Sequence, residues 1–250
     1  SNGDATWSQV LENHLVDDLN QIPEFHRYCR PFSGSTDPQP GIVIEFPSYV
    51  MSGKNFFGYD LAGGDNAYDA SHASTKIRSV GVWFTDFNNT NSNTGALANE
   101  PRVYLVPAGL DVMRTPTGGA DSTRTYNVFN QSMPLPYDIG GTDINNPDWS
   151  PVVDSLQEPF GQMRRLGSFR AYHDSGQFDE SETHNNGRLI GRSVWNTKWM
   201  LIIPGATLLN DPDEGLNRFI YGASDGNGNR DGNGVKDIKL LFQTYSIIGD

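Results

Sequence analysis

The pattern of hydrophobic and polar positions centres on one short apolar run, Trp199–Ile203, with the sequence Trp-Met-Leu-Ile-Ile. Val194 and Trp195 precede this run, and Pro204 and Gly205 stop it. A helix would need a longer periodic pattern, whereas a short run of aromatic and β-branched residues before a Pro-Gly stop is typical of a strand. We therefore expect a strand that is buried on both faces and forms the centre of the fold.

Other short apolar or alternating segments predict the remaining strands. These segments are Ile42–Phe46, Lys76–Phe87, Arg102–Pro107, Thr125–Phe129, Gly167–His173, Leu216–Tyr221 and Val235–Ile248, with a tight turn expected at Asn210–Asp213. Long polar loops rich in glycine and proline join them, and the sequence has neither an internal repeat nor the strand–helix–strand spacing of a parallel sheet. The pattern predicts a mainly β fold, an antiparallel β-sandwich of jelly-roll type.

An amphipathic helix is expected near the start of the chain, over residues 7–20. Thr6 is a suitable N-cap, and Pro23 marks the end of the pattern. The apolar positions recur at spacings of three and four residues and include Trp7, Val10, Leu11, Leu15 and Leu19. A second, short helix is expected near residues 155–164. The N-terminal helix would pack against the sheet or connect it to an upstream region.

The net charge of the chain indicates which kinds of molecule it can bind. Its 30 acidic and 18 basic residues give a formal net charge of -12. Such an excess of carboxylates disfavours nucleic acids and anionic membranes and favours cations. No segment approaches the roughly 20 consecutive apolar residues of a membrane span. We expect a helical segment over residues 1–31 and one β-sandwich domain over residues 32–250.

Composition favours an extracellular or surface-exposed setting. Cys29 is the only cysteine of the sequence, so no internal disulfide can form, although this does not exclude export. The 27 glycines and 15 prolines, together with the acidic balance, are typical of turn-rich secreted β modules. Ser1–Asp4 lacks the basic start and apolar stretch of a signal peptide, so we expect a fragment or a processed product.

Alternating oxygen-bearing side chains near the C-terminus predict a calcium loop. From Asn229 to Asp237, oxygens stand at positions one, three, five and nine, and glycine at position six. Calcium prefers about six to eight oxygen ligands on a tightly curled backbone, which glycine permits. The candidate ligands are Asp225, Asn227, Asn229, Asp231, Asn233, Val235 and Asp237. Position twelve has no Glu, which excludes a full helix–loop–helix calcium hand, and an ordinary exposed turn is the alternative interpretation.

Aromatic residues among glycines and prolines suggest a different kind of site, a surface that stacks on sugars. The candidates are Phe56, Phe57, Tyr59, Tyr68 and Trp149. Most aromatic residues of a β-sandwich belong to its core, and this is the alternative for these side chains. A carbohydrate-binding module is therefore the second functional hypothesis.

We do not expect an enzyme from the sequence. Gly63-Gly64 is followed by an aspartate, so this pair does not form a phosphate loop. The loop from His173 to His184 has two histidines and four carboxylates but lacks the close spacing of a metal site. A solvated acidic loop explains it better, and a hydrolase that uses it is a remote alternative.

Five passages resemble a family of bacterial domains found at the C-terminal ends of very large proteins related to the A subunit of insecticidal toxin complexes. They are SGKNFFGYDLAGGDNAYD at 52–69, VYLVPAGLDVMRTP at 103–116, SFRAYHDSG at 168–176, SVWNTKWMLIIPGATLLNDPDEGL at 193–216 and DIKLLFQTY at 237–245. The resemblance implies a noncatalytic β-sandwich assembly domain in a large secreted particle. Its partners would be other protein subunits or upstream domains of the same protein.

Overall fold

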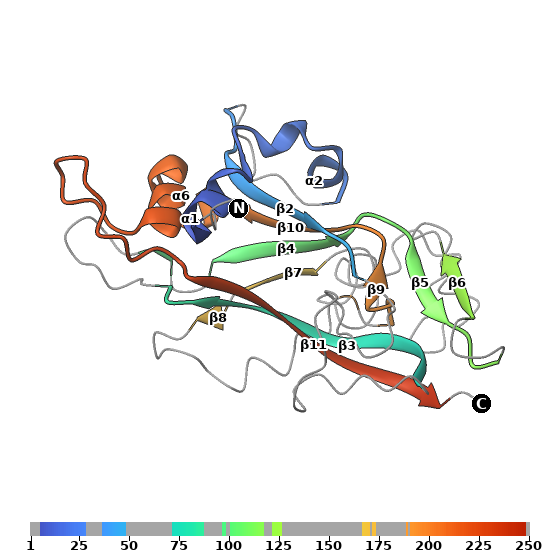
Figure 1. The fold of residues 1–250 in the computed structure, drawn as a ribbon. Helices are drawn as coiled ribbons and strands as arrows, with labels where there is room; N and C mark the ends of the chain where they lie inside the picture. The colour runs from blue at the N-terminus through green and yellow to red at the C-terminus, as the bar shows by residue number, and fades with distance from the viewer. Residues whose placement is uncertain are drawn as a thin grey trace, which may run out of the picture.

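The computed structural model describes the chain in segments, namely residues 6–28, 37–48, 72–87, 97–98, 101–117, 122–126, 167–170, 172–173, 189 and 191–248. Strands form most of the regular structure in these segments, so the predicted mainly β class is confirmed (Figure 1). The strands make three sheets, one of five strands and two of three.

The five-stranded sheet has the order β1-β2-β10-β4-β7. Its members are β1 (Leu15–Val16), β2 (Gly41–Phe46), β10 (Trp199–Pro204), β4 (Arg102–Pro107) and β7 (Gly167–Arg170). All neighbours are antiparallel, and β10 pairs along its whole length with β2, from Trp199 opposite Phe46 to Pro204 opposite Gly41. The predicted central strand is confirmed, because β10 is the middle strand and each of its residues is buried.

The two faces of β10 pack into two separate apolar clusters, which explains why its apolar run is unbroken. Trp199, Leu201 and Ile203 lie in the larger cluster, on one face of the sheet. Met200 and Ile202 lie in the smaller cluster on the other face, which is closed by side chains from the N-terminal segment. Alternation along the strand thus buries both faces of the sheet.

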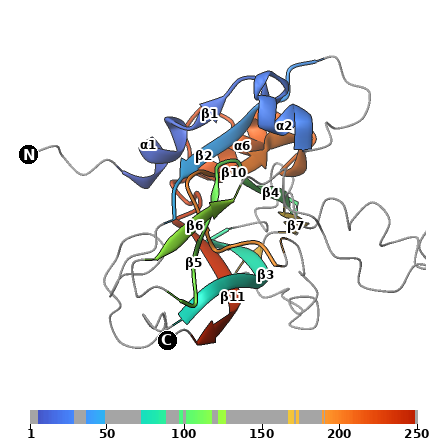
Figure 2. The ribbon, with the colours of Figure 1, turned by 90° about the vertical axis from the view of Figure 1, so that its right-hand side faces the viewer.

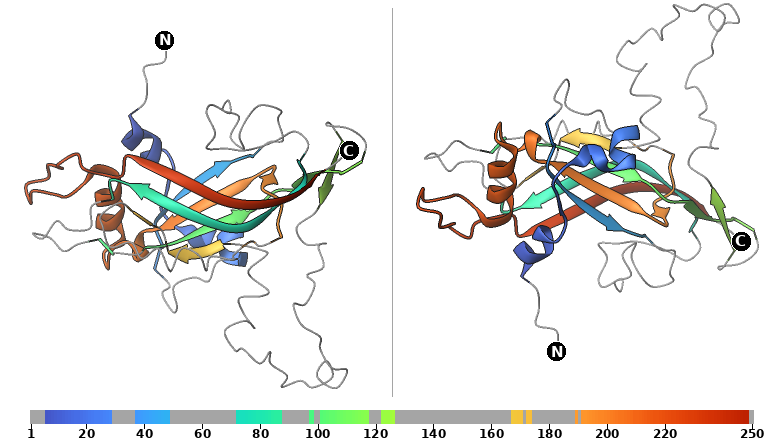
Figure 3. Two further views of the ribbon diagram at one scale, coloured as in Figure 1. Left: turned by 90° about the horizontal axis from the view of Figure 1, so that it is seen from below. Right: turned by 90° about the horizontal axis from the view of Figure 1, so that it is seen from above.

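The second sheet faces the first across the larger cluster and has the order β11-β3-β8. It consists of β11 (Asp237–Ile248), β3 (His72–Thr85) and β8 (Tyr172–His173). β11 and β3 form a long antiparallel ribbon that crosses the molecule below the first sheet (Figure 3). β8 runs parallel to β3, which departs from the purely antiparallel expectation. The indole of Trp199 lies 6.1 Å from the ring of Phe242 between centroids and joins the two sheets.

A third, smaller sheet extends one end of the molecule (Figure 1), the end that faces the viewer in Figure 2. Its order is β6-β5-β9, with β6 at Thr123–Tyr126, β5 at Asp111–Arg114 and β9 at Trp195–Asn196. β6 begins two residues before the predicted strand Thr125–Phe129, and residues 127–129 lie outside the described part of the chain. β5 and β9 are too short to produce a visible alternation in the sequence.

The predicted helix over residues 7–20 is wrong in extent, because α1 spans only Trp7–Glu12. Thr6 is its N-cap, and Thr6 Oγ1 accepts a hydrogen bond from the Gln9 amide at 3.4 Å. Leu15 and Val16 then pair with β2, and a 3-10 turn, η1, follows at Leu19–Gln21. Sheet pairing therefore overrides the helical periodicity, and Pro23 opens a further helix, α2 (Pro23–Tyr28), instead of ending one.

The predicted strand over Leu216–Tyr221 is also wrong, because this segment belongs to the helix α6 (Pro212–Tyr221). The preceding 3-10 turn, η3, spans Gly205–Thr207. Asp211 is the N-cap of α6, where its Oδ1 accepts from the Glu214 amide at 3.2 Å. The expected tight turn is the first turn of this helix, with Pro212 placed where its missing N–H costs nothing.

The apolar residues of α6 belong to the hydrophobic core, although they form a helix and not a strand. Leu216, Phe219 and Ile220 are buried in the larger cluster, and Phe219 meets the ring of Phe84 edge-on at 4.9 Å between centroids. α6 therefore closes one end of the space between the two large sheets. The helix expected near residues 155–164 lies outside the described part of the chain.

Candidate functional site

Five of the seven candidate calcium ligands, all except Val235 and Asp237, lie on a loop that projects beside α6, which we call the Asx loop and define as residues 224–234 (Figure 1). An isolated β-bridge between Ser224 and Arg230 closes its outer part. Gly226, Gly228 and Gly232 adopt positive φ angles of 82°, 91° and 74°, which side chains disfavour. The glycines thus allow the tight curl that the sequence predicts.

Asp225 organises the tip of the Asx loop through hydrogen bonds to its own backbone. Its Oδ1 accepts from the amides of Asn227 at 2.7 Å and Asn229 at 3.1 Å. Its Oδ2 accepts from the Asn229 side-chain amide at 2.9 Å. These donors, the Asn229 side chain first and the Asn227 amide next, lower the pKa of Asp225 below its ordinary value. The carboxylate therefore stays ionised and holds the turn.

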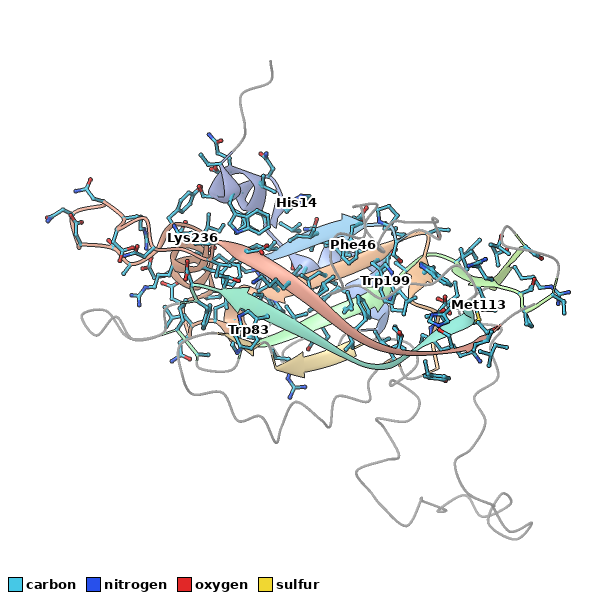
Figure 4. All side chains as sticks on the ribbon, turned by 60° about the horizontal axis from the view of Figure 1, so that its bottom comes forward. His14, Phe46, Trp83, Met113, Trp199 and Lys236 are labelled. Atoms are coloured by element: carbon cyan, nitrogen blue, oxygen red, sulfur yellow. The ribbon has the colours of Figure 1, made fainter. Side chains whose placement is uncertain are left out.

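Asp231 organises a second turn, at the base of the loop. Its Oδ1 accepts from the amides of Ala223 at 3.1 Å and Asn233 at 2.9 Å. The Lys236 ammonium donates to the Gly232 carbonyl at 2.6 Å, and Figure 4 shows Lys236 where the loop enters β11. Asp231 and Lys236 thus fix the base of the loop between α6 and the ribbon.

A forked ion pair joins the Asx loop to the first turn of α6. Arg230 donates from Nη1 and Nη2 to the two carboxylate oxygens of Glu214, at 2.9 and 2.7 Å. Arg218, one helical turn further on, donates from Nε to Glu214 Oε1 at 2.9 Å. Hydrogen bonding to Arg230 is the main cause that lowers the pKa of Glu214 from 4.5 to about 2, with Arg218 adding to it and burial opposing it.

The predicted calcium ligands are distributed over three local structures. Asp225, Asn227 and Asn229 form the tip turn, and Asp231 and Asn233 form the turn at the base. Val235 is buried, and its amide donates to the Phe219 carbonyl at 2.8 Å, while Asp237 lies in β11 opposite Thr85. The described residues contain no group of three or more histidine, cysteine, aspartate or glutamate side chains placed to hold a metal ion. Calcium binding stays a prediction.

A buried polar network lies where the small third sheet meets β10. The Arg192 guanidinium and the Asp111 carboxylate are 1% and 0% exposed, and Nε lies 3.2 Å from Oδ2. Arg192 Nη2 donates to Asp111 Oδ1 at 3.2 Å, and Asn196 Nδ2 donates to the same oxygen at 2.8 Å. Asn196 Oδ1 in turn accepts from the amides of Gly109 and Lys198, at 3.0 and 2.9 Å.

Ser48 extends this network to the central strand. Its Oγ accepts from the Asn196 amide at 2.9 Å and from the Trp199 indole N–H at 2.8 Å, and donates to the Val194 carbonyl at 2.8 Å. The network therefore ties β5 and β9 to the start of β10 and to the segment after β2. The burial of both partners of the ion pair points to a structural role.

The sequence did not identify the anchors of the loop or the members of the buried network. A signal existed for α6, because Asp211-Pro212-Asp213-Glu214 is a typical helix start with acidic residues in the first turn. Recognising that helix would have placed Glu214 and Arg218 on one face, four residues apart. No local signal exists for Asp111 and Arg192, which are separated by 81 residues.

The remaining candidate residues lie outside the described part of the chain. They are the aromatic residues Phe56, Phe57, Tyr59, Tyr68 and Trp149, the acidic loop residues 174–184, and Cys29. Sugar binding therefore stays a prediction. None of the helices in the described segments is long and apolar enough to cross a membrane. A comparison of the chain with protein-family models, curated proteins and solved structures finds no match.

Proposed function

We propose that the chain is a noncatalytic structural module that contacts other protein subunits of a large secreted or toxin-like assembly through the outer strand β11. The proposal includes an antiparallel sandwich of jelly-roll type as the architecture, which the two sheets facing each other across the larger cluster support. The observation that carries the proposal is the apolar, uncharged C-terminal part of β11.

The C-terminal end of β11 exposes apolar side chains that the rest of the described surface mostly hides. Tyr245, Ile247 and Ile248 are 47%, 51% and 80% exposed. The register with β3 shifts between Gln243 and Thr244 and again between Tyr245 and Ile247, so the inward and outward positions change along the strand. Ile247 and Ile248 are consecutive and both exposed, whereas regular alternation would turn one of them inward.

The C-terminal part of β11 also lacks the charged and proline residues that commonly protect an outer strand from pairing. Among the described strands, β11 has β3 as its neighbour on one side and ends the sheet on the other. From Leu240 to Ile248 the sequence LLFQTYSII has neither a charged residue nor a proline. Free strands of monomeric proteins are commonly blunted with lysine, proline or inward charges. An unprotected strand of this length favours coverage by a partner.

The occupant we propose is an extended segment of another protein subunit, added to the sheet alongside β11. Strand addition of this kind draws its affinity from main-chain hydrogen bonds and its specificity from alternate side chains. Ile247 and Ile248 would supply apolar contacts, and the low charge of the strand suits a partner segment that is also apolar. Catalysis is not required for such a role.

A second copy of the chain serves as the probe for this surface, because main-chain pairing makes small demands on sequence. We expect the purified full chain to self-associate reversibly as its concentration rises in sedimentation velocity. Ile247→Lys combined with Ile248→Lys should weaken this association at least roughly tenfold, equivalent to about 1.4 kcal/mol. The two ammonium groups would be buried without partners in the contact.

Leu110→Lys is the matched control, because Leu110 is a similarly exposed apolar residue, at 42%, located between β4 and β5. It should leave the association unchanged. A chain that remains monomeric at every concentration, or a control that weakens the association as much as the β11 variant, would contradict the proposal.

Stabilisation by calcium is part of the same proposal and has a separate test. Calcium that binds only the folded chain raises its melting temperature, and excess chelator should reverse the rise. Asp237→Asn should abolish the calcium-dependent increment with little effect on the metal-free melting temperature, because the bonds that organise the described part of the loop are accepted by Asp225 and Asp231 and not by Asp237. A melting temperature that does not respond to calcium would assign Asp225 and Asp231 to turn formation alone.

A further inference from the structure

The Asx loop contains four pairs in which an aspartate or asparagine precedes glycine, namely Asp225-Gly226, Asn227-Gly228, Asp231-Gly232 and Asn233-Gly234. In such a pair the glycine amide nitrogen can attack the Cγ of the preceding side chain, because glycine has no Cβ to obstruct the approach. The structure distinguishes the four pairs by two properties: whether the glycine N–H is already hydrogen-bonded, and whether the glycine backbone is free to move.

We propose that Asn227-Gly228 is a site of spontaneous deamidation in the folded protein. The Gly228 amide loses its proton, and its nitrogen forms a bond to Asn227 Cγ while the side-chain nitrogen leaves as ammonia. The resulting five-membered succinimide is opened by water at either of its two carbonyls and yields aspartate or isoaspartate at position 227. One water enters and one ammonia leaves, and no atom is oxidised or reduced.

Hydrogen bonding of the glycine amide excludes the two aspartate pairs as reactive sites. The Gly226 amide donates to Ser224 Oγ at 3.1 Å, and the Gly232 amide donates to the Tyr221 carbonyl at 3.0 Å. A bonded N–H is harder to deprotonate and is held away from the attacking direction. The Gly228 amide, in contrast, has no hydrogen-bond acceptor among the described residues, although the amides on either side of it, from Asn227 and Asn229, both donate to Asp225.

The two asparagine pairs differ in the free space around their glycines. Gly228 is exposed, and a Cβ built on it would meet no atom within 4 Å. Gly234 is buried, and a Cβ built there would overlap the carbonyl of Ile220 at the end of α6. Succinimide formation requires the backbone around the glycine to rotate, which the packing against α6 prevents at Gly234 unless this segment opens. Asn227 is therefore the reactive asparagine of the loop.

The product changes the electrostatics of the loop. A neutral amide at position 227 becomes a carboxylate next to Asp225, in a chain whose net charge is already -12. The isoaspartate form also inserts one carbon into the main chain between Asp225 and Asn229, the two residues that close the tip turn. The tip is therefore expected to become more acidic and less ordered with age, while the Glu214–Arg230 anchor stays in place.

The experiment uses an internal control, because Asn227 and Asn233 occur in identical Gly-Asn-Gly tripeptides. The full chain is incubated folded at mildly alkaline pH and sampled over time, and peptide mass spectrometry measures the replacement of amide nitrogen by oxygen at each site. We expect deamidation at Asn227 to be at least roughly tenfold faster than at Asn233, which corresponds to a local opening free energy of about 1.4 kcal/mol.

Two further measurements separate the effect of structure from that of sequence. In denaturant the two tripeptides should react at the same rate, because the packing of Gly234 is lost. Asn227→Gln should remove the fast phase in the folded chain, whereas Asn233→Gln should leave it unchanged. Equal rates at the two sites in the folded protein, or faster reaction at Asn233, would overturn the proposal.

Discussion

Replacing Asp111 with alanine is expected to lower the free energy of unfolding by about 3–5 kcal/mol. The substitution removes the Asp111 carboxylate that pairs with the buried Arg192 guanidinium, which is 1% exposed. It also removes one acceptor of the Asn196 side-chain amide, which then loses the 2.8 Å bond that orients it toward β5. Denaturant unfolding at neutral pH measures the loss, as a fall in midpoint at unchanged slope.

The double variant Asp111→Leu with Arg192→Met tests whether the charge left behind is the cause. Because both charges are removed and similar volumes remain, we expect it to recover most of the stability lost by Asp111→Ala. A double variant that is less stable than Asp111→Ala would contradict this explanation of the lost stability.

Replacing Glu214 with alanine is expected to lower the free energy of unfolding by about 1.5–3 kcal/mol at neutral pH, the usual range for hydrogen bonds to charged groups. Glu214 accepts from Arg230 and Arg218, and its side chain is 26% exposed, so solvent screens the interaction only in part. The Asx loop loses its forked anchor to α6. We expect Glu214→Ala to accelerate amide exchange in the loop relative to the unaltered chain. Exchange in β11, which keeps its pairing with β3, should accelerate less.

The same carboxylate predicts how stability depends on pH. The pKa of Glu214 is lowered from 4.5 to about 2 in the folded chain, so the folded state holds the proton more weakly than the unfolded state. Its stabilising contribution is complete above pH 4.5 and is lost as the pH falls toward about 2. Glu214→Ala should flatten this part of the stability profile, and Asp213→Ala, an exposed neighbour in the same helical turn, should not. Equal profiles for the two variants would contradict the role of the ion pair.

The strands that could be predicted are those in which local pattern and burial agree. Arg102–Pro107 and Trp199–Ile203 are apolar on both faces and lie in the middle of the first sheet, so no competing arrangement satisfies them. β5 and β9 could not be predicted, because Asp111–Arg114 carries two charged residues that the fold buries by pairing or packing. Their pattern makes sense only once partners from distant segments are known.

Two of the errors in secondary structure have a common physical origin. Leu15, Val16 and Leu19 continue the helical spacing of α1, yet sheet pairing and the smaller cluster capture them. Leu216–Tyr221 satisfies a strand pattern, yet the cap at Asp211 and the buried face of α6 make it helical. In both cases a few residues fit either period, and tertiary packing decided between them.

The candidate site could be located from the sequence but not assembled. Spacing correctly identified the Asx loop as tightly curled, because glycine at positive φ is a local property. Which groups the carboxylates engage is not local: Asp231 reaches back to the Ala223 amide, and Arg230 reaches Glu214 across sixteen residues. The spacing of oxygen-bearing side chains is therefore equally compatible with a metal-binding loop and with a turn whose carboxylates accept hydrogen bonds from its own backbone.

The position of β10 has a consequence for the synthesis of the chain. β2 ends at Phe46 and β4 at Pro107, and both pair with β10, which begins only at Trp199. At about 5–20 residues per second, a ribosome needs on the order of ten seconds after completing β2 to supply the strand that joins the two. During that interval the edges of β2 and β4 that pair with β10 lack their native neighbour. Nascent chains of this protein should therefore depend on chaperones that shield hydrophobic strands until β10 has left the ribosome.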